Sequence, residues 1–423
     1  MLRSALYISY FGIREPLVQT QVLTYLRELV AGGWNIHLIT FEKGWPDSFS
    51  NEELKFWQNK LQNEGITWHI NKYTDSRSLK AKIRDIFSGL RQARTIIRKN
   101  DIKIVHGRAH VGTMIGELSR FFLKVKLLFD IRGFNPEEQV ESGRWSQRSL
   151  KYFIYKTAEK YLLMRASGFI LLTNAGRKAL FPQSIHQPGD PQELYRLPDK
   201  RPIQIIPCCV DDSRFEMKLN QKQQSNLTKE TLGLGNCLKI IAHVGALGGL
   251  YPEERIVKTF AEIKKQYPDY GFIILSQTST NQFKELYEAA SLPADSLWVG
   301  KVPVSEVANY LAICDWGLSL KKESYSQLSC SPTKIPEYLL AGLPVISSKG
   351  IGDTDKILTE NEVGLVFNAW DDADIVRCVS DMSKLEKISN LRQKCQETAI
   401  NLFDLRHVGG PRYRGIYETL ING

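Results

Sequence analysis

The fold is read most directly from one stretch in the second half of the chain, Ser331-Pro-Thr-Lys-Ile-Pro-Glu-Tyr-Leu-Leu-Ala-Gly-Leu-Pro-Val-Ile346. Its loop leads into a helix that we predict to begin near Thr333 and to end at Gly342, since glycine commonly terminates a helix. A strand is expected to begin directly afterwards, at Leu343. Loop, helix and strand in this order form one unit of a parallel α/β sheet.

The same alternation of short apolar runs and longer amphipathic runs continues through the 423 residues in both directions. In the first half we expect strands at residues 5–9, 35–40, 66–70, 102–106, 126–130, 168–173 and 203–206. In the second half we expect them at 238–244, 271–275, 296–299, 316–320, 343–346 and 364–367. Between strands lie helical patterns such as Leu79, Ile83, Ile86, Leu90 and Ile97, which share one face and are expected in the core. The pattern predicts an α/β protein with two Rossmann-like, doubly wound parallel sheets.

Two segments interrupt the alternation and mark the domain boundary. Residues 181–202 contain five prolines, and residues 219–227 form the polar run LNQKQQSNL, so neither is expected in a core. We therefore assign residues 1–210 to a first domain and 211–405 to a second. The last segment, 406–423, has helical spacing and is expected to pack back toward the first domain. Ligands bind outside the carboxyl ends of parallel strands, so two such domains are expected to face a central cleft.

The charge is unevenly distributed along the chain. Residues 1–200 hold 31 Lys and Arg against 19 Asp and Glu (+12), whereas residues 201–423 hold 25 against 27 (−2). A basic first domain beside a nearly neutral second one favours an anionic partner for the first. The sequence shows no interleaving of basic and aromatic residues typical of nucleic-acid binding, so we expect no nucleic-acid partner.

A basic amphipathic helix is predicted at residues 79–100. It carries Lys80, Lys82, Arg84, Arg91, Arg94, Arg98 and Lys99 around its apolar stripe. Such a helix can bind an anionic membrane surface, or it can be a solvated helix whose stripe packs on the sheet. Both interpretations are open from the sequence.

Cysteine usage and hydropathy indicate the compartment. The seven cysteines include no CxxC pair, the N-terminus lacks a signal-peptide pattern, and no 18 apolar residues run together. We expect a cytoplasmic protein that is soluble or peripheral at the inner face of the membrane. Because HExxH and Walker motifs are absent, we expect neither a metal nor a cofactor.

Lys334 and Glu337 are the first candidates for chemistry. Lys334 falls in the first turn of the predicted helix, where backbone N–H groups already favour an anion, so its ammonium suits a phosphate or diphosphate. Glu337 lies one turn further, and a carboxylate accepts hydrogen bonds from two ribose hydroxyls. A capped helix with both side chains in solvent is the alternative. Gly245, Gly248 and Gly249 follow a predicted strand and either admit a diphosphate close to the backbone or form a plain βα turn.

The stretch resembles the donor-binding segment of the retaining family-4 glycosyltransferases of the GT-B fold, also described as glycosyl transferases group 1. In that family the second Glu of an E-x7-E motif binds the ribose of a nucleotide sugar, and Glu337 occupies its place. The first Glu would fall at Ser329 and is absent. Further segments match the family in the expected order along the chain: Tyr7–Leu26, Val105–His110, Phe129–Phe134, Ile206–Asp211, Val244–Gly249 and Gly350–Asp353.

The resemblance implies roles for further residues. Donor binding is expected from Ser331, Thr333, Lys334, Glu337 and the glycines 245, 248 and 249. His106 and Arg108 are expected to point into the cleft and act with Glu337 in catalysis; a histidine buried at a strand end is the alternative for His106 and His110. On the acceptor side we expect Gln19, His110 and Arg132, although Arg132 could instead pair with Asp130 or Glu138.

These expectations combine into one predicted function. The chain is expected to be a metal-independent, retaining glycosyltransferase that moves a sugar from a nucleotide diphosphate-sugar to a glycan or lipid-linked acceptor in cell-surface polysaccharide or glycolipid biosynthesis. Two alternatives remain open on the same scaffold: a nucleotide-sugar epimerase and a catalytically silent sugar-nucleotide-binding protein. The sequence leaves open which sugar, nucleobase and acceptor are used.

Overall fold

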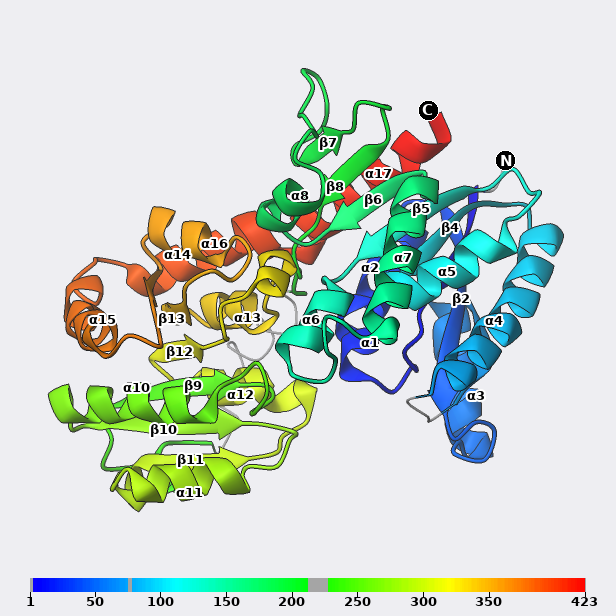
Figure 1. The fold of residues 1–423 in the computed structure, drawn as a ribbon. Coiled ribbons are helices and arrows are strands. Elements are labelled where there is room, and N and C mark those ends of the chain that lie inside the picture. The colour runs from blue at the N-terminus through cyan, green and yellow to red at the C-terminus, as the bar shows by residue number, and fades with distance from the viewer. Residues whose placement is uncertain (1–2, 75–77, 212–226, 423) are drawn as a thin grey trace. The chain divides into compact units, whose positions relative to one another are not determined.

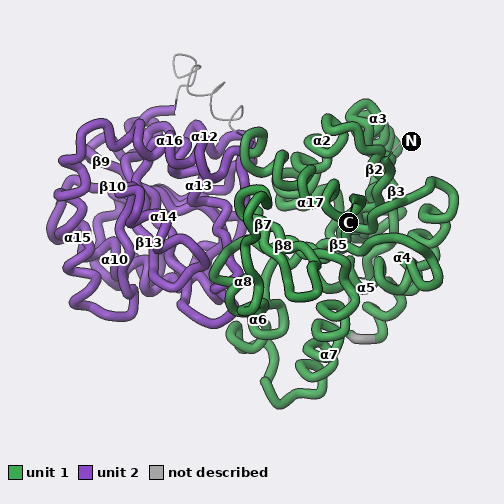
Figure 2. Tube along the Cα trace, turned by 90° about the horizontal axis from the view of Figure 1, so that it is seen from above, with its two compact units in different colours: residues 1–207, 405–423 green, residues 208–404 purple. Residues whose placement is uncertain are grey.

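The computed structural model of the chain describes residues 3–74, 78–211 and 227–422 (Figure 1). It divides into two compact units, one of Met1–Pro207 with Leu405–Gly423 and one of Cys208–Asp404 (Figure 2). The division after residue 207 and the return after residue 404 fall within a few residues of the expected boundaries. Each unit is described by itself below.

The first unit is built on an eight-stranded sheet with the order β3-β2-β1-β4-β5-β6-β8-β7. Its strands are β1 (Arg3–Ile8), β2 (Trp34–Lys43), β3 (Ile66–Tyr73), β4 (Ile102–Arg108), β5 (Lys126–Ile131), β6 (Gly168–Leu171), β7 (Leu194–Arg196) and β8 (Pro202–Ile205). All neighbours pair in parallel except β7, which pairs antiparallel with β8. Every strand expected in this half of the sequence is present.

Strand β7 corrects the expectation that residues 181–202 lie outside the core. Leu194 is buried on the sheet edge, and Phe181 and Leu197 belong to the core on the same sheet. The prolines flank β7 or begin β8 and do not interrupt a ladder, which is where an edge strand tolerates them. A proline-rich sequence thus hides a three-residue strand.

The helices of the first unit cover both faces of this sheet. They are α1 (Pro16–Gln21), α2 (Leu23–Ala31), α3 (Asn51–Asn63), α4 (Leu79–Lys99), α5 (Ala109–Ser119), α6 (Asn135–Glu141), α7 (Leu150–Arg165), α8 (Asn174–Leu180) and α17 (Gly410–Asn422). Helix α5 packs on β4 and β5 with α4 and α7 beside it, while α2 and α17 pack together (Figure 1). Alternation along β4 separates the layers, because Val105 joins the core under α4 and α5 whereas His106 contacts α17.

The apolar stripe of α4 is only partly in the core. Ile96 and Ile97 are buried, but Ile83 is 44% exposed, so the stripe leaves the sheet toward the N-terminal end of the helix. Among the described helices of the whole chain, none combines the length and apolarity needed to cross a bilayer.

The second unit repeats the architecture on a six-stranded parallel sheet of order β11-β10-β9-β12-β13-β14. Its strands are β9 (Lys239–Val244), β10 (Tyr270–Leu275), β11 (Leu297–Gly300), β12 (Trp316–Ser319), β13 (Val345–Ser348) and β14 (Gly364–Phe367). Its helices are α10 (Glu253–Gln266), α11 (Asn281–Ala289), α12 (Val307–Leu311), α13 (Lys334–Leu340), α14 (Thr354–Glu360), α15 (Asp372–Leu385) and α16 (Leu391–Phe403). Two apolar cores fill the two faces of this sheet. Helix α13 begins one residue after Thr333 and is closed by Gly342 at φ +76°.

Candidate functional site

Both sheets reverse their strand order at one point, and that point marks a crevice for ligands. The order runs outward from β1 and β4 in the first sheet and from β9 and β12 in the second. The six strands from β3 to β6 in the first sheet, and all six strands of the second, follow the Rossmann order. Loops that leave such a pair of strands diverge to opposite faces of the sheet and leave room between them. The segments after β1, β4, β9 and β12 are therefore the ones that can hold a ligand.

In the second unit, a glycine-rich loop leaves β9 at this point. Gly245, Gly248 and Gly249 have φ values of +120°, +83° and +62°, a region that residues with a Cβ avoid. Gly248 and Tyr251 exchange two backbone hydrogen bonds of 2.9 and 3.0 Å, which closes a tight turn. A Cβ placed on Gly245 would lie 3.4 Å from Nζ of Lys334. The loop is therefore a βα turn in which the backbone of Gly245 lies close to the ammonium of Lys334.

Two buried lysines converge beside this loop. Lys334 is 6% exposed and its ammonium has no hydrogen-bond partner among the described residues. Lys321, 7% exposed, follows β12 and donates a 2.6 Å hydrogen bond to Oε1 of Gln327. Both ammonium groups lie over the ring of Tyr251, at 4.8 Å for Lys334 and 5.2 Å for Lys321. A buried cation with no partner is costly, so this arrangement favours an anion between loop and lysines.

The electrostatics of Lys334 agree with an anion site. Burial and then the charge of Lys321 lower its pKa to about 7. Burial and then the charge of Lys334 also hold the pKa of His243 well below its usual value, so this fully buried imidazole is neutral. A bound anion would stabilise the charged form of Lys334 and raise its pKa again. The alternative in which Lys334 is a solvated helix residue is wrong.

The remaining predicted donor residues lie on or beside α13. Glu337 is half-buried one turn after Lys334, and Thr333 precedes the helix without capping it through its side chain. Oγ of Ser331 accepts a hydrogen bond from the Cys208 N–H at 3.1 Å. Ser329, at the position where the E-x7-E motif would have its first Glu, is buried, and its hydroxyl donates to the Ser326 carbonyl at 2.8 Å. No carboxylate therefore stands at that position.

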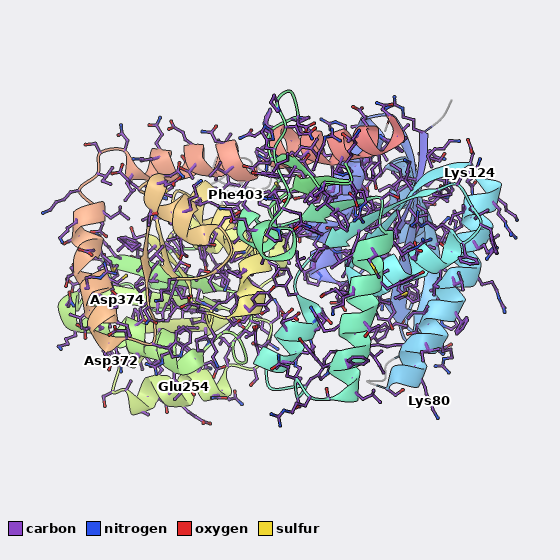
Figure 3. The ribbon with its side chains drawn as sticks, turned by 45° about the horizontal axis from the view of Figure 1, so that its top comes forward. Lys80, Lys124, Glu254, Asp372, Asp374 and Phe403 are labelled. Atoms are coloured by element: carbon purple, nitrogen blue, oxygen red, sulfur yellow. The ribbon has the colours of Figure 1, made fainter. Side chains whose placement is uncertain are left out.

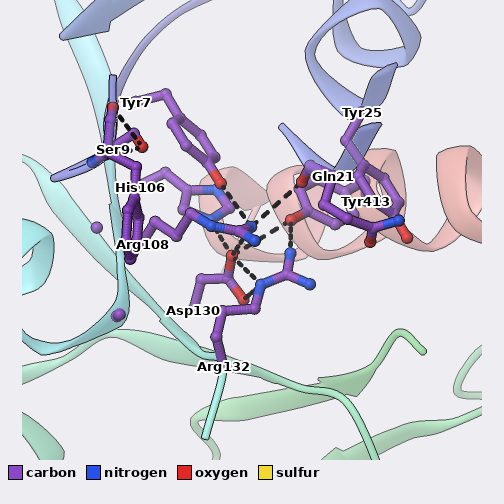
Figure 4. A network of polar contacts seen from close by, with 12 residues as sticks. Tyr7, Ser9, Gln21, Tyr25, His106, Arg108, Asp130, Arg132 and Tyr413 are labelled. Atoms are coloured by element: carbon purple, nitrogen blue, oxygen red, sulfur yellow. Dashed lines mark hydrogen bonds and ion pairs between the residues drawn. The ribbon is translucent and has the colours of Figure 1, made fainter. Parts of the chain in front are cut away.

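In the first unit, strand ends at the switch point meet in a buried polar network (Figure 4). Its centre is Asp130 at the end of β5, whose Oδ2 lies 2.8 Å from Arg132 Nε, 3.4 Å from His106 Nε2 and 3.7 Å from an Arg108 guanidinium nitrogen. Helix α17 closes the network, because Tyr417 lies 2.9 Å from Nδ1 of His106 and Tyr413 accepts a 2.6 Å bond from Arg132. The network joins β4, β5 and α17.

Asp130 offsets part of the positive charge in this network. Burial alone would raise the pKa of Asp130, but Arg132, His106 and Arg108 outweigh it and hold that pKa well below its usual value. Burial lowers the pKa of His106 despite the neighbouring carboxylate. The carboxylate is therefore ionised and the imidazole neutral near pH 7, with the two arginines supplying the opposite charge.

The predicted orientation of His106 is corrected by this network. The side chain is 0% exposed and lies among Tyr7, Tyr413 and Tyr417, so it does not point into an open crevice. The cause is the alternation of β4, which turns position 106 toward α17. Its assignment as a catalytic residue stays a prediction, as does that of Arg108, which is 7% exposed and donates to Tyr7 and to the Gln21 carbonyl.

The predicted acceptor-side residues are not brought together. Arg132 pairs with Asp130, the second of its two interpretations. His110, in the first turn of α5, is buried and lies 2.9 Å from Oε2 of Glu159 on α7. Gln19 is exposed on α1. Their acceptor-side roles stay predictions.

Sequence reasoning missed Lys321 and Asp130 as functional candidates. Both follow or end a predicted strand at the carboxyl edge of a sheet, and that position was the available signal. Within residues 3–74, 78–211 and 227–422, no group of three His, Cys, Asp or Glu side chains is arranged to hold a metal ion.

Two Rossmann-like units, each with a crevice at its switch point, define the GT-B class of α/β proteins. Residues 226–402, which make up most of the second unit, match the family model described as glycosyl transferases group 1. This bears out the resemblance found in the sequence.

Three known proteins illustrate the similarity. The putative teichuronic acid biosynthesis glycosyltransferase TuaH of Bacillus subtilis is 30% identical over 105 residues, which span 25% of this chain and 26% of that protein. Sucrose-phosphate synthase from Thermosynechococcus elongatus aligns with a TM-score of 0.70 at 14% identity, over 99% of both chains. Anabaena Alr3699/HepE in complex with UDP and glucose aligns with a TM-score of 0.67 at 13% identity, over the full length of both chains. The two structures show the shared fold.

Proposed function

We propose that the protein is a glycosyltransferase that takes a sugar from a nucleoside-diphosphate sugar held by the second unit. The observation that carries the proposal is the buried ammonium of Lys334, which has no hydrogen-bond partner among the described residues and faces the Gly245 backbone. A diphosphate is the anion that such a crevice between glycine loop and lysines can accept. The family of the second unit and the UDP complex of HepE support this choice.

In the proposed reaction, the lysines act on the leaving group. The bond between the anomeric carbon and the diphosphate oxygen breaks through an oxocarbenium-like transition state, and negative charge develops on the diphosphate. Lys334, Lys321 and the backbone of Gly245–Gly249 stabilise that charge without a metal. Glu337 accepts hydrogen bonds from the ribose hydroxyls.

We further propose that the configuration of the sugar is retained. Glu337, the carboxylate that interacts electrostatically with Lys334, is assigned to the ribose, and Ser329 occupies the place where the family motif has its first Glu. The acceptor oxygen then attacks on the face from which the diphosphate departs, and its proton passes to the departing phosphate oxygen. Atoms and charge balance without a further reactant.

The acceptor and compartment belong to the same proposal. The basic first unit suits a glycan or lipid-linked acceptor that carries negative charge, and the name of the TuaH relative supports a role in cell-surface polysaccharide biosynthesis. The seven free cysteines support a cytoplasmic location.

Ligand-induced stabilisation tests the donor site. UDP, GDP, ADP and their hexose conjugates are added to the full chain and the unfolding midpoint is measured; a ligand at ~100 times its Kd adds about 2.7 kcal/mol. One nucleotide is expected to stabilise the wild type but neither Lys334→Ala nor Glu337→Ala. Lys258→Ala, which removes a half-exposed lysine of the same unit, is expected to respond as the wild type does. Equal stabilisation of all four proteins would refute the assignment.

Product analysis separates the alternatives. Incubation of the stabilising sugar nucleotide without acceptor is expected to give only slow release of nucleotide. A new sugar nucleotide would instead identify an epimerase. Binding without release or transfer above the background of Lys334→Ala would identify a silent binding protein.

A further inference from the structure

Helix α7 packs Leu162 in the core but also exposes a row of apolar side chains to solvent. Leu150, Phe153 and Met164 are 73%, 67% and 70% exposed, and their spacing places them on one face with half-exposed Tyr161. The opposite face buries Glu159 beside His110 and Lys156. Single exposed apolar residues are common, but a row of them on one helix face marks a contact surface.

The loop between α5 and β5 extends this surface. Phe121 and Phe122 are 53% and 88% exposed, and Phe122 is held at φ +65°, a conformation that costs a bulky residue ~1 kcal/mol. Arg120 fixes the loop against α7, because it donates to the Arg165 carbonyl at 2.6 Å and to Glu117 at 2.7 Å. The two rings are thus presented to solvent by a rigid turn.

Helix α4 completes the surface on the other side. Lys82 of α4 donates a 2.8 Å hydrogen bond to the hydroxyl of Tyr155 on α7, so the two helices meet above α5. Phe87 on α4 is 64% exposed. We define the apolar patch as six side chains that are each more than half exposed: Phe87, Phe121, Phe122, Leu150, Phe153 and Met164.

Positive charge surrounds the apolar patch. Helix α4 has seven Lys and Arg and one carboxylate, Asp85, which is buried and bonded to Tyr10 and Thr74. Helix α7 has four Lys and Arg and one carboxylate, the buried Glu159. Lys80 at the start of α4 and Lys124 beside Phe122 project outward from the same unit (Figure 3). Both helices therefore bury their carboxylates, whereas Lys160 and most cations of α4 are exposed; Lys156 and Arg165 pair with Glu137 and Glu117.

We propose that this face of the first unit docks on a bilayer surface that contains anionic phospholipid. The aromatic and aliphatic side chains enter the boundary between headgroups and acyl chains, and the surrounding cations bind lipid phosphates. A second copy of the chain fits this surface less well, because a two-fold contact would bring the same cations against one another. The proposal does not depend on the donor site, so membrane binding and sugar transfer can fail separately.

Vesicle sedimentation of the full chain tests the proposal. We expect binding to vesicles of phosphatidylcholine with about 30% phosphatidylglycerol, little binding to phosphatidylcholine alone, and release as salt is raised. The double variant Leu150→Ser/Phe153→Ser is expected to bind about tenfold or more weakly. Leu238→Ser is the matched control, since this residue of the second unit is 72% exposed and lies outside the patch.

A charge variant tests the cations separately. Lys151→Gln/Lys160→Gln is expected to lower binding about 25-fold, because each cation near an anionic surface contributes about fivefold. Lys265→Gln/Lys356→Gln removes two exposed cations of the second unit and is expected to bind as the wild type does. Unchanged unfolding midpoints show that the variants remain folded.

Three results would overturn the proposal: no binding to the anionic vesicles, equal weakening by the control variants, or equal binding to both vesicle types. Sedimentation velocity without lipid tests whether a second copy of the chain binds this face instead. A dimer of the wild type that Leu150→Ser/Phe153→Ser dissociates, with no vesicle binding, would assign the face to self-association and reject the membrane.

Discussion

The two units differ in how buried positive charge is compensated near the point where the strand order reverses. In the first unit, Arg108 and Arg132 share Asp130, which is fully buried, and α17 supplies hydroxyl groups to the rest of the network. In the second unit, Lys334 has no hydrogen-bond partner among the described residues. Burial and then its charge lower the pKa of the neighbouring His243. A shared counter-charge within the unit stabilises the two buried arginines, whereas the ammonium of Lys334 has no hydrogen-bond partner among the described residues, and we propose that a ligand supplies its counter-charge. In our proposal the same topology serves structure in one unit and donor binding in the other.

The largest effect on stability is expected from removal of the carboxylate of the first unit. Asp130→Asn leaves Arg132 and Arg108 buried without their counter-charge, and we expect the free energy of unfolding to fall by about 3–5 kcal/mol. Urea unfolding at pH 7 measures this loss. Asp199→Asn, which breaks an exposed pair with Arg201, is expected to cost about 1 kcal/mol or less. Equal losses in both variants would mean that the two arginines do not need Asp130 as a counter-charge.

The lysine of the second unit should behave in the reverse manner. Lys334→Met removes a buried charge, so the free energy of unfolding without ligand is expected to stay level or rise, while kcat/KM for the donor falls about 100- to 1000-fold. Unfolding and initial-rate measurements on one preparation test both. Lys258→Met is the control for loss of an exposed lysine. Strong destabilisation of Lys334→Met would contradict the contrast between the units.

The low pKa of Lys334 makes both the free energy of unfolding and donor binding depend on pH. Its value of about 7 lies below the value of ~10.4 in an unfolded chain, so the unfolded state binds more protons between these pH values and stability rises with pH across that range. Donor binding has the opposite dependence, because the anion needs the protonated lysine. We expect the Kd for the nucleotide to rise up to about tenfold per pH unit above pH 7.

Calorimetry in two buffers of different ionisation enthalpy measures the proton taken up on binding. Lys334→Arg is the control, since a guanidinium stays charged throughout and should remove the dependence that is due to the protein. A wild type and a Lys334→Arg variant with the same pH profile would show that Lys334 does not titrate on binding.

The smallest expected effect comes from the edge of the first network. Tyr417→Phe removes the hydroxyl beside Nδ1 of His106 and leaves a buried nitrogen without that partner, which costs about 1 kcal/mol of stability. Thermal unfolding measures it. Tyr161→Phe, at a half-exposed tyrosine of α7, should change stability by less than ~0.5 kcal/mol. No difference between the two would argue that α17 is held by packing alone.

Much of the fold was predictable because its signals are local. Every strand of the second unit matched a short apolar run, and α13 ended at the glycine that its sequence predicts. The short edge strand β7 was missed because prolines surround it, although Leu194 is buried there. Lys334 and Glu337 could be proposed as donor-site residues from their place in a helix after a strand. Lys321 was not, because its approach to Lys334 depends on how β12 and α13 pack.

The sequence by itself determined two doubly wound units, the family of the second, and a basic first half, because periodicity, turn residues and charge are properties of neighbouring positions. Tertiary structure decided which charges are neutralised. His106 meets Tyr417 across 311 positions, and Lys334 meets Gly245 and Tyr251 across a sheet edge. Burial also decided that α7 packs Leu162 in the core while it exposes Leu150, Phe153 and Met164. The energy of a charge or an apolar group depends on what surrounds it in space, and no pattern along the chain states that.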